Sequence, residues 1–157
     1  MESLLNWIYD LGISATVRES SWAFPTLECI HLYSMVFLIG IISAFDLRLM
    51  GVSIEDQPLS HYSKLVRRWV WLPLIVNTIT GTLLFMSKPT EYSANIAFVV
   101  KMMFLFLGVV YHAIIVRRSD RWNDLARMPA GVSLLGGVSL VFWLGILASS
   151  RWIAYVI

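Results

Sequence analysis

The chain is poor in cysteine and in charged residues, and each shortage excludes a class of protein. Cys29 is the one cysteine among 157 residues, so neither an intrachain disulfide nor a multi-cysteine zinc or iron–sulfur site can form. Charged residues make up 14% of the chain, whereas a typical soluble domain has about 25%. The formal net charge of +2 is too small to indicate a nucleic-acid partner. Most of the surface is therefore expected to face something other than water.

The motifs of common enzyme classes are also missing. The sequence has no Gly-rich phosphate loop and no H-E-x-x-H, G-x-S-x-G or C-x-x-C motif. Its first residues carry Glu2 in place of a basic cluster, which argues against a cleavable signal peptide. The sequence therefore has no motif that indicates a particular catalytic reaction.

Long apolar runs are what the chain has in abundance, since 58% of its residues are hydrophobic. Four runs are close to the length of roughly 20 residues that a helix needs to cross a bilayer. A backbone in lipid must satisfy its own hydrogen bonds, so the runs should be helical. The expected fold is all-α, an integral membrane four-helix bundle over residues 21–157 that contacts the lipid bilayer. The expected spans are about 24–45, 69–86, 96–116 and 130–149.

The first 20 residues have a different pattern. Apolar side chains recur at spacings of three and four, which predicts one amphipathic helix. We expect this helix of residues 1–20 to lie at the membrane interface, and a docking surface for a partner subunit is the alternative. The apolar positions are Leu4, Trp7, Ile8, Leu11 and Ala15.

The distribution of basic residues predicts the orientation of the spans. Eight of the twelve lysines and arginines lie in the two connectors after the first and third spans. The positive-inside rule places these connectors in the cytoplasm and both termini on the extracytoplasmic side. The eight residues are Arg48, Lys64, Arg67, Arg68, Arg117, Arg118, Arg121 and Arg127.

Three ionisable residues lie at a similar depth near the outer face, and such residues inside a membrane are candidates for a functional site. Glu28 and His31 are in the first two turns of the first span, and Lys101 is as far into the third. A Glu28–Lys101 ion pair beside His31 is the expected arrangement. The alternative is that the charges only extend outward to the headgroups.

The histidines suggest haem, but their depths argue against a pair of them as ligands. His31 and His112 differ in depth by ten or so residues, on the order of 15 Å at the α-helical rise. Mixed ligation remains open, because Met102 is near the height of His31 and a His–Met pair can bind haem b. His31 with Met35 could instead hold Cu(I).

Two other polar groups of the spans are interpreted as structural. Asp46 and Arg48 are expected to form a local ion pair that ends the first span. Asn77 and Thr78, in the middle of the second span, are expected to make hydrogen bonds between helices.

Several segments, taken in order, resemble an uncharacterised family of bacterial four-helix inner-membrane proteins, a domain of unknown function. The resemblance covers nearly the whole chain and repeats the pattern of Glu28, His31 and Lys101. It implies a four-helix fold in a bacterial inner membrane and no particular activity. The segments are W-A-F-P-T-L-E-C-I-H at 22–31, D-L-R-L-M-G at 46–51, T-G-T-L-L-F at 80–85, N-I-A-F-V-V-K at 95–101 and R-W-I-A-Y at 151–155.

These observations lead to one main functional hypothesis and two alternatives. The main one is a membrane-anchor or electron-transfer subunit with a haem or quinone site near the outer face, where His31, Glu28, Lys101, Met102 and His112 are the candidate cofactor-binding residues. A metal-handling or small-solute permease is the first alternative, with the polar residues along its pathway. A structural subunit without a cofactor is the second. Each would work with other membrane or periplasmic subunits or as a homo-oligomer.

Overall fold

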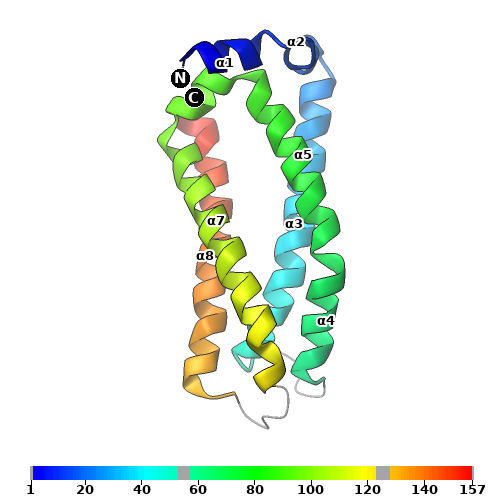
Figure 1. The fold of residues 1–157 in the computed structure, drawn as a ribbon, viewed down its shortest axis with the longest axis vertical. Helices are drawn as coiled ribbons and strands as arrows, with labels where there is room; N and C mark the ends of the chain where they lie inside the picture. The colour runs from blue at the N-terminus through cyan, green and yellow to red at the C-terminus, as the bar shows by residue number, and fades with distance from the viewer. Residues whose placement is uncertain (1, 53–56, 123–127, 157) are drawn as a thin grey trace.

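The computed structural model describes residues 2–52, 57–122 and 128–156, and in these parts the chain is all-α. Four helical segments are long and apolar enough to cross a membrane, so the chain is a multi-pass membrane protein (Figure 1). This confirms the predicted fold class. Arg127, used above to predict the orientation, lies outside the described residues. The spans are α3 (Ala23–Leu49), α4 (Leu59–Trp69) continued by α5 (Trp71–Ser87), α7 (Ile96–Arg118) and α8 (Ala130–Val156).

The second span begins about ten residues earlier than its apolar run, because α4 is amphipathic. Leu59 and Val66 are buried against the bundle, whereas Lys64 is exposed. The helix is interrupted at Val70, between α4 and α5. Pro73 lacks the amide that would otherwise bond to the carbonyl one turn earlier, and its ring crowds that carbonyl. The interruption therefore lies within the turn that precedes Pro73.

The N-terminal region forms two short helices where one was predicted, α1 (Glu2–Tyr9) and α2 (Gly12–Glu19). The chain leaves the helical conformation at Leu11. The buried Ser14 hydroxyl donates to the Ile8 carbonyl at 2.7 Å, which satisfies an acceptor at the end of α1. Together with α6 (Pro89–Ala94), these helices lie across one end of the bundle (Figure 1).

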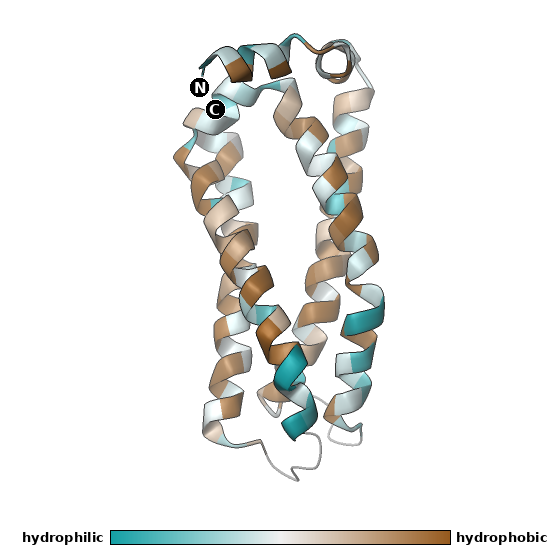
Figure 2. Cartoon of the chain, viewed as in Figure 1, coloured by the Kyte–Doolittle hydropathy of each residue, from teal (hydrophilic) through white to brown (hydrophobic). Residues whose placement is uncertain are grey.

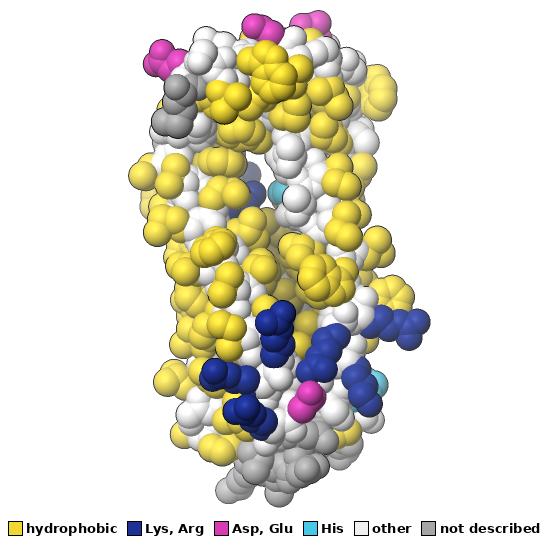
Figure 3. Space-filling view, in the orientation of Figure 1, with side chains coloured by type: hydrophobic (Ala, Val, Ile, Leu, Met, Phe, Trp, Pro, Cys, Tyr) yellow, Lys and Arg dark blue, Asp and Glu magenta, His cyan; other side chains and the backbone are white. Residues whose placement is uncertain are grey.

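The two ends of the bundle differ in charge. The termini lie at the end covered by α1, α2 and α6, which we call the termini end (Figure 1). The other end carries η1 (Ser119–Trp122) and most of the arginines, and we call it the arginine-rich end (Figure 3). Figure 2 shows hydrophobic residues along the middle of the long helices and hydrophilic residues gathered near the ends. This banding is typical of helices that cross a bilayer.

The four spans do not close completely around the bundle axis. α3 packs against α4, α5 and α8, and α7 packs against α8. By contrast, within the described parts of the chain no Cα atom of α5 comes within 8 Å of one in α7. α6 joins these two helices at the termini end, and α4 meets α7 at the arginine-rich end. The bundle therefore has an open side between α5 and α7, which we call the α5–α7 seam.

α3 and α8 approach each other closely at Gly136. A Cβ atom built on Gly136 of α8 would lie 2.6 Å from the backbone oxygen of Asp46 in α3. Only a glycine therefore permits this contact, as is common where membrane helices pack tightly. One hydrophobic cluster of the core surrounds this level, and the other lies nearer the termini end. Their buried members are Phe45, Leu49, Leu59, Val66, Ile115, Val116 and Val132 in one, and Met35, Leu38, Ile42, Trp143 and Ile146 in the other.

Candidate functional site

Toward the termini end, α3 and α5 are joined by four buried polar side chains, which we call the His31 cluster: His31, Ser34, Asn77 and Thr80. The Asn77 amide donates to the His31 carbonyl at 3.0 Å and to the Ser34 hydroxyl at 3.1 Å. Asn77 therefore makes the predicted contact between helices. Thr78, by contrast, is exposed and donates to the Leu74 carbonyl of its own helix at 2.8 Å.

The hydrogen bonds of Thr80 determine which nitrogen of His31 carries the proton. The Thr80 hydroxyl donates to the Val76 carbonyl at 2.7 Å. A hydroxyl has one hydrogen, so a Thr80 hydroxyl that donates to Val76 accepts from Nδ1 at its 3.0 Å contact with His31. His31 then holds its proton on Nδ1 and presents Nε2 as an acceptor. Gly81 leaves room for the ring, since a Cβ there would be 3.0 Å from His31 Cε1.

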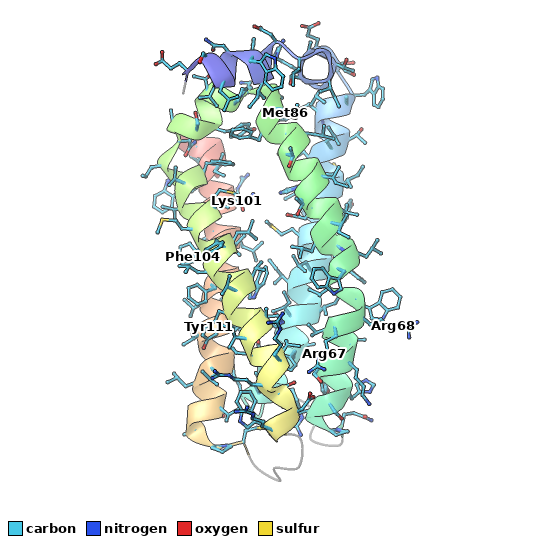
Figure 4. All side chains as sticks on the ribbon, viewed as in Figure 1. Arg67, Arg68, Met86, Lys101, Phe104 and Tyr111 are labelled. Carbon is cyan, nitrogen blue, oxygen red and sulfur yellow. The ribbon has the colours of Figure 1, made fainter. Side chains whose placement is uncertain are left out.

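Lys101 faces the His31 cluster from the other side of the α5–α7 seam. It is half-buried and lies on the inner face of α7, one turn from the buried Ala97. Figure 4 shows its side chain leaving α7 toward the interior, and Figure 3 shows a hollow at this height with basic and histidine side chains inside it. The structure thus brings together two of the residues that the sequence singled out.

Two other residues proposed for this site are exposed. In the part of the chain that the structure describes, Glu28 makes no ion pair with Lys101. Glu28 lies 18 residues before Asp46, which is five helical turns, so the two share one side of α3. Met102 is 45% exposed, on the face of α7 that continues through Val109 and Ala113. The expected Glu28–Lys101 ion pair is therefore not formed, and the His31–Met102 ligand set stays a prediction.

Met35, the other proposed metal ligand, lies one turn from His31 on α3. It is 4% exposed and packs in the core with Leu38 and Ile42. Cys29 is exposed. Among the described residues, no three His, Cys, Asp or Glu side chains come together as a metal-binding group. The role of His31 and Met35 as metal ligands stays a prediction.

A second polar group lies deeper in the bundle, and the sequence interpretation missed its centre. We call it the Asp46 cluster: Asp46 on α3, His112 on α7, and Ser139 and Trp143 on α8. Asp46 is 0% exposed and does not pair with Arg48, whose Nε donates to the Gln57 carbonyl at 3.1 Å. One signal in the sequence could have located Asp46. It continues the inner stripe of α3 at helical spacing after His31, Met35, Leu38 and Ile42.

The Asp46 cluster is poor in hydrogen bonds for groups so deeply buried. Asp46 Oδ1 lies 3.8 Å from His112 Nδ1, which is 3.4 Å from the Ser139 hydroxyl. Both Asp46 carboxylate oxygens, His112 Nε2 and Trp143 Nε1 are buried without a hydrogen-bond partner. Such atoms are rare in native proteins and are typical of positions that bind a ligand or water.

A cavity of about 460 Å³ lies beside this cluster, and both His112 and Trp143 line it. Its walls are mainly apolar and come from all the spans, with Leu38 from α3, Leu74 from α5 and Val109 from α7 among them. The cavity lies in the α5–α7 seam. Toward the arginine-rich end, an Arg67–Asp120 ion pair of 3.2 Å joins α4 to η1 beside it.

The two clusters are well separated along the bundle. Fifteen positions of α3 separate His31 from Asp46, which is about 22 Å at the helical rise of 1.5 Å per residue. Because His112 contacts Asp46, it cannot ligate the same haem as His31 within one chain. The His31 cluster and the Asp46 cluster are therefore two distinct candidate sites.

Near the termini end, an exposed ion pair links Lys88 and Glu91 at 2.9 Å across the start of α6. The hydrogen bond from Lys88 to Glu91, together with the Glu91 charge, raises the pKa of Lys88. Glu91 thus already has a cationic partner.

Comparison with known proteins identifies a family but no characterised relative. Neither a curated protein nor a solved structure matches this chain. The family comparison confirms the resemblance to an uncharacterised family that the motifs indicated. A model described as a family of unknown function (DUF6644) matches residues 14–156, nearly the whole chain, and the protein therefore belongs to that family.

Proposed function

We propose that this protein is a membrane-anchor or electron-transfer subunit that binds a quinone in the cavity beside the Asp46 cluster. The observation that carries the proposal is this apolar cavity, with His112 and Trp143 at its wall and a nitrogen of each without a partner. The arginine-rich end would face the cytoplasm of a bacterium with the protein in its inner membrane. The quinone site is then in the cytoplasmic half of the bundle, whereas the sequence had favoured the outer face.

The size and access of the cavity suit such a ligand. Its volume of about 460 Å³ lies in the range of small-molecule sites. Its mainly apolar walls match a quinone ring and the first part of an isoprenoid tail. Because the cavity lies in the α5–α7 seam, a molecule dissolved in the bilayer could reach it sideways without crossing water.

The polar atoms suit both redox forms of the ligand. The Trp143 indole can only donate, which fits a quinone carbonyl oxygen. His112 Nε2 can accept from the hydroxyl of a quinol when the imidazole is neutral and can donate to a carbonyl when it is protonated. A site that binds both quinone and quinol needs a donor such as Trp143 and a group such as His112 that can either donate or accept.

Asp46 gives this site a second acid–base group. Reduction of a quinone consumes protons as well as electrons, and the electrons would come from a redox partner subunit. Asp46 lies 3.8 Å from His112 Nδ1, on the side of the ring away from Nε2. It is therefore a positioning residue, which can favour the protonated imidazole while His112 contacts the ligand.

A binding titration tests the proposal. Purified protein in nanodiscs is titrated with a short-tailed ubiquinone analogue while tryptophan fluorescence is followed, since Trp71 and Trp143 line the cavity. Saturable quenching is expected. His112→Gln should weaken binding about tenfold, the loss of one hydrogen bond of roughly 1.4 kcal/mol. Ala113→Phe should abolish it by filling the cavity, which Ala113 lines.

The matched control is His61→Gln, because His61 is exposed on α4 and does not line the cavity. This variant should bind the analogue as the unchanged protein does. Quenching that does not saturate, or that is equal in the unchanged protein, His112→Gln and Ala113→Phe, would overturn the proposal. The melting temperature of each variant shows whether lost binding is only lost folding.

A further inference from the structure

Lys101 is a cation inside the bundle, and among the described residues no acidic side chain pairs with it. We infer that the hollow between Lys101 and His31 binds the phosphate of a phospholipid, taken from the leaflet at the termini end. This site is separate from the quinone cavity, because it involves the His31 cluster and not the Asp46 cluster. The inference does not rest on the proposed function.

The position of Lys101 places its charge within the bundle. It lies on the face of α7 that also carries the buried Ala97, Gly108 and His112. Lys101 is five residues from the beginning of α7 at Ile96, about 8 Å along the helix. That depth lies just inside the hydrocarbon boundary, within reach of a phosphate at the level of the headgroups.

No acidic side chain in the described structure neutralises this charge. The described ion pairs of lysine and arginine join Arg18 to Glu19, Arg67 to Asp120 and Lys88 to Glu91. Glu28, the acid expected to pair with Lys101, is exposed on α3. An unpaired ammonium in an apolar setting is costly unless it gains a counter-ion. The hollow thus offers a favourable place to an anion.

The surroundings of the hollow indicate that this anion comes from the bilayer. α1 packs on α5 and α6, and α2 packs on α3 and α5, so these helices cover the bundle at the termini end (Figure 1). The open side is lateral, along the α5–α7 seam. Exposed apolar residues border it, among them Trp71 of α5 and Phe106 of α7. A lipid headgroup can enter from this side with its acyl chains outside.

His31 adds a feature that a phospholipid headgroup can use. Its Nδ1 contacts Thr80, which leaves Nε2 as the acceptor of the ring. A headgroup with a hydroxyl next to its phosphate, such as phosphatidylglycerol, can give its phosphate to Lys101 and its hydroxyl to His31. Such a headgroup should bind more tightly than phosphatidylcholine, which has no hydroxyl.

Native mass spectrometry with a lipid titration tests the inference. Delipidated protein is titrated with phosphatidylglycerol, phosphatidylcholine, diacylglycerol or inorganic phosphate, and the bound species and the melting temperature are recorded. Phosphatidylglycerol should bind and raise the melting temperature. Lys101→Gln should weaken its binding at least tenfold, whereas Lys101→Arg should retain it. Lys88→Gln is the matched control, because Lys88 is an outward-facing lysine already paired with Glu91.

Four other results would overturn or limit the lipid-binding inference. Equal binding of phosphatidylglycerol by the unchanged protein and Lys101→Gln would overturn the inference, as would equal binding of diacylglycerol and phosphatidylglycerol. Binding of inorganic phosphate as tight as that of the lipid would refute the lipid source and retain the anion site. A loss of binding in Lys88→Gln as large as in Lys101→Gln would assign the effect to general surface charge.

Discussion

Thr80 is the residue that holds His31 in place. Its hydroxyl donates to its own helix and accepts from His31 Nδ1, which joins α5 to α3. Without this acceptor, the buried Nδ1–H would have no partner, and an unsatisfied buried donor costs more than the hydrogen bond itself contributes. Hydrogen bonds between membrane helices are modest, however, because the unfolded state also finds partners.

We therefore expect Thr80→Val to lower the free energy of unfolding by about 1 kcal/mol. Unfolding in mixed micelles, followed by circular dichroism as the fraction of sodium dodecyl sulfate rises, measures this quantity. Thr78→Val is the matched control, since Thr78 is exposed and its hydroxyl bonds only to the Leu74 carbonyl. Equal destabilisation by the two variants would show that the His31 contact contributes nothing.

The Asp46 carboxyl group places unsatisfied polar atoms in a buried region. Its environment contains an imidazole, a hydroxyl and an indole, yet neither carboxylate oxygen has a hydrogen-bond partner. Buried polar groups in native proteins are nearly always satisfied. The exception lies beside a cavity, which favours a ligand-binding role over a purely structural one.

At the scale of the helices, the α3–α8 contact depends on Gly136. A methyl group on this residue would lie 2.6 Å from the Asp46 backbone oxygen and 3.1 Å from Leu49 Cβ. A backbone atom in a packed helix cannot move aside as a flexible side chain can. The two helices would have to separate, and the Asp46 cluster, which both of them form, would be displaced.

Gly136→Ala should accordingly destabilise the protein by about 1–3 kcal/mol, the usual cost of overpacking. Gly137→Ala is its neighbour and control, because a Cβ there meets nothing within 4 Å. That variant should be neutral or slightly stabilising, since alanine is the better helix former. The midpoints of unfolding in mixed micelles compare the two, and equal midpoints would contradict the close approach.

At the scale of the whole molecule, the difference in charge between the two ends predicts the orientation of the protein in the membrane. The arginine-rich end should remain in the cytoplasm, because basic connectors resist translocation. Glu19 and Lys64 lie near opposite ends of the bundle and are both exposed. Each can therefore carry a reporter without disturbing the interior.

In a Cys29→Ser background, Glu19→Cys should react with a membrane-impermeant maleimide on intact cells. Lys64→Cys should react only after the cells are lysed. The extent of labelling on a gel measures both. The opposite labelling pattern would show that the orientation is reversed. The quinone cavity would then lie in the outer half of the bilayer and the Lys101 hollow in the inner half.

The spans were predictable because their signal is local. A run of about 20 apolar residues can be read without knowing what it packs against. The same holds for the amphipathic pattern of the first 20 residues. The division of that region at Leu11 was not predicted, since it depends on a hydrogen bond from Ser14 to Ile8.

The candidate sites were predictable only in part. The depths of His31, Lys101 and His112 follow from counting along the helices, and the structure places Lys101 opposite His31. Depth does not give rotation, however. Glu28 has a suitable height but is exposed and forms no ion pair with Lys101 in the described structure. Asp46 was interpreted as the partner of a neighbour in sequence, whereas its neighbours in space come from α7 and α8.

By itself, the sequence determined that the chain crosses a membrane four times, where the spans lie and which ends carry the positive charge. These properties depend on the length and composition of each segment. The tertiary structure alone decided which face of each span points inward and which spans pack together. α3 and α7 are apolar on almost every side, so no polar stripe marks an outer face. Only packing between helices could leave the α5–α7 seam open and enclose Asp46 with His112.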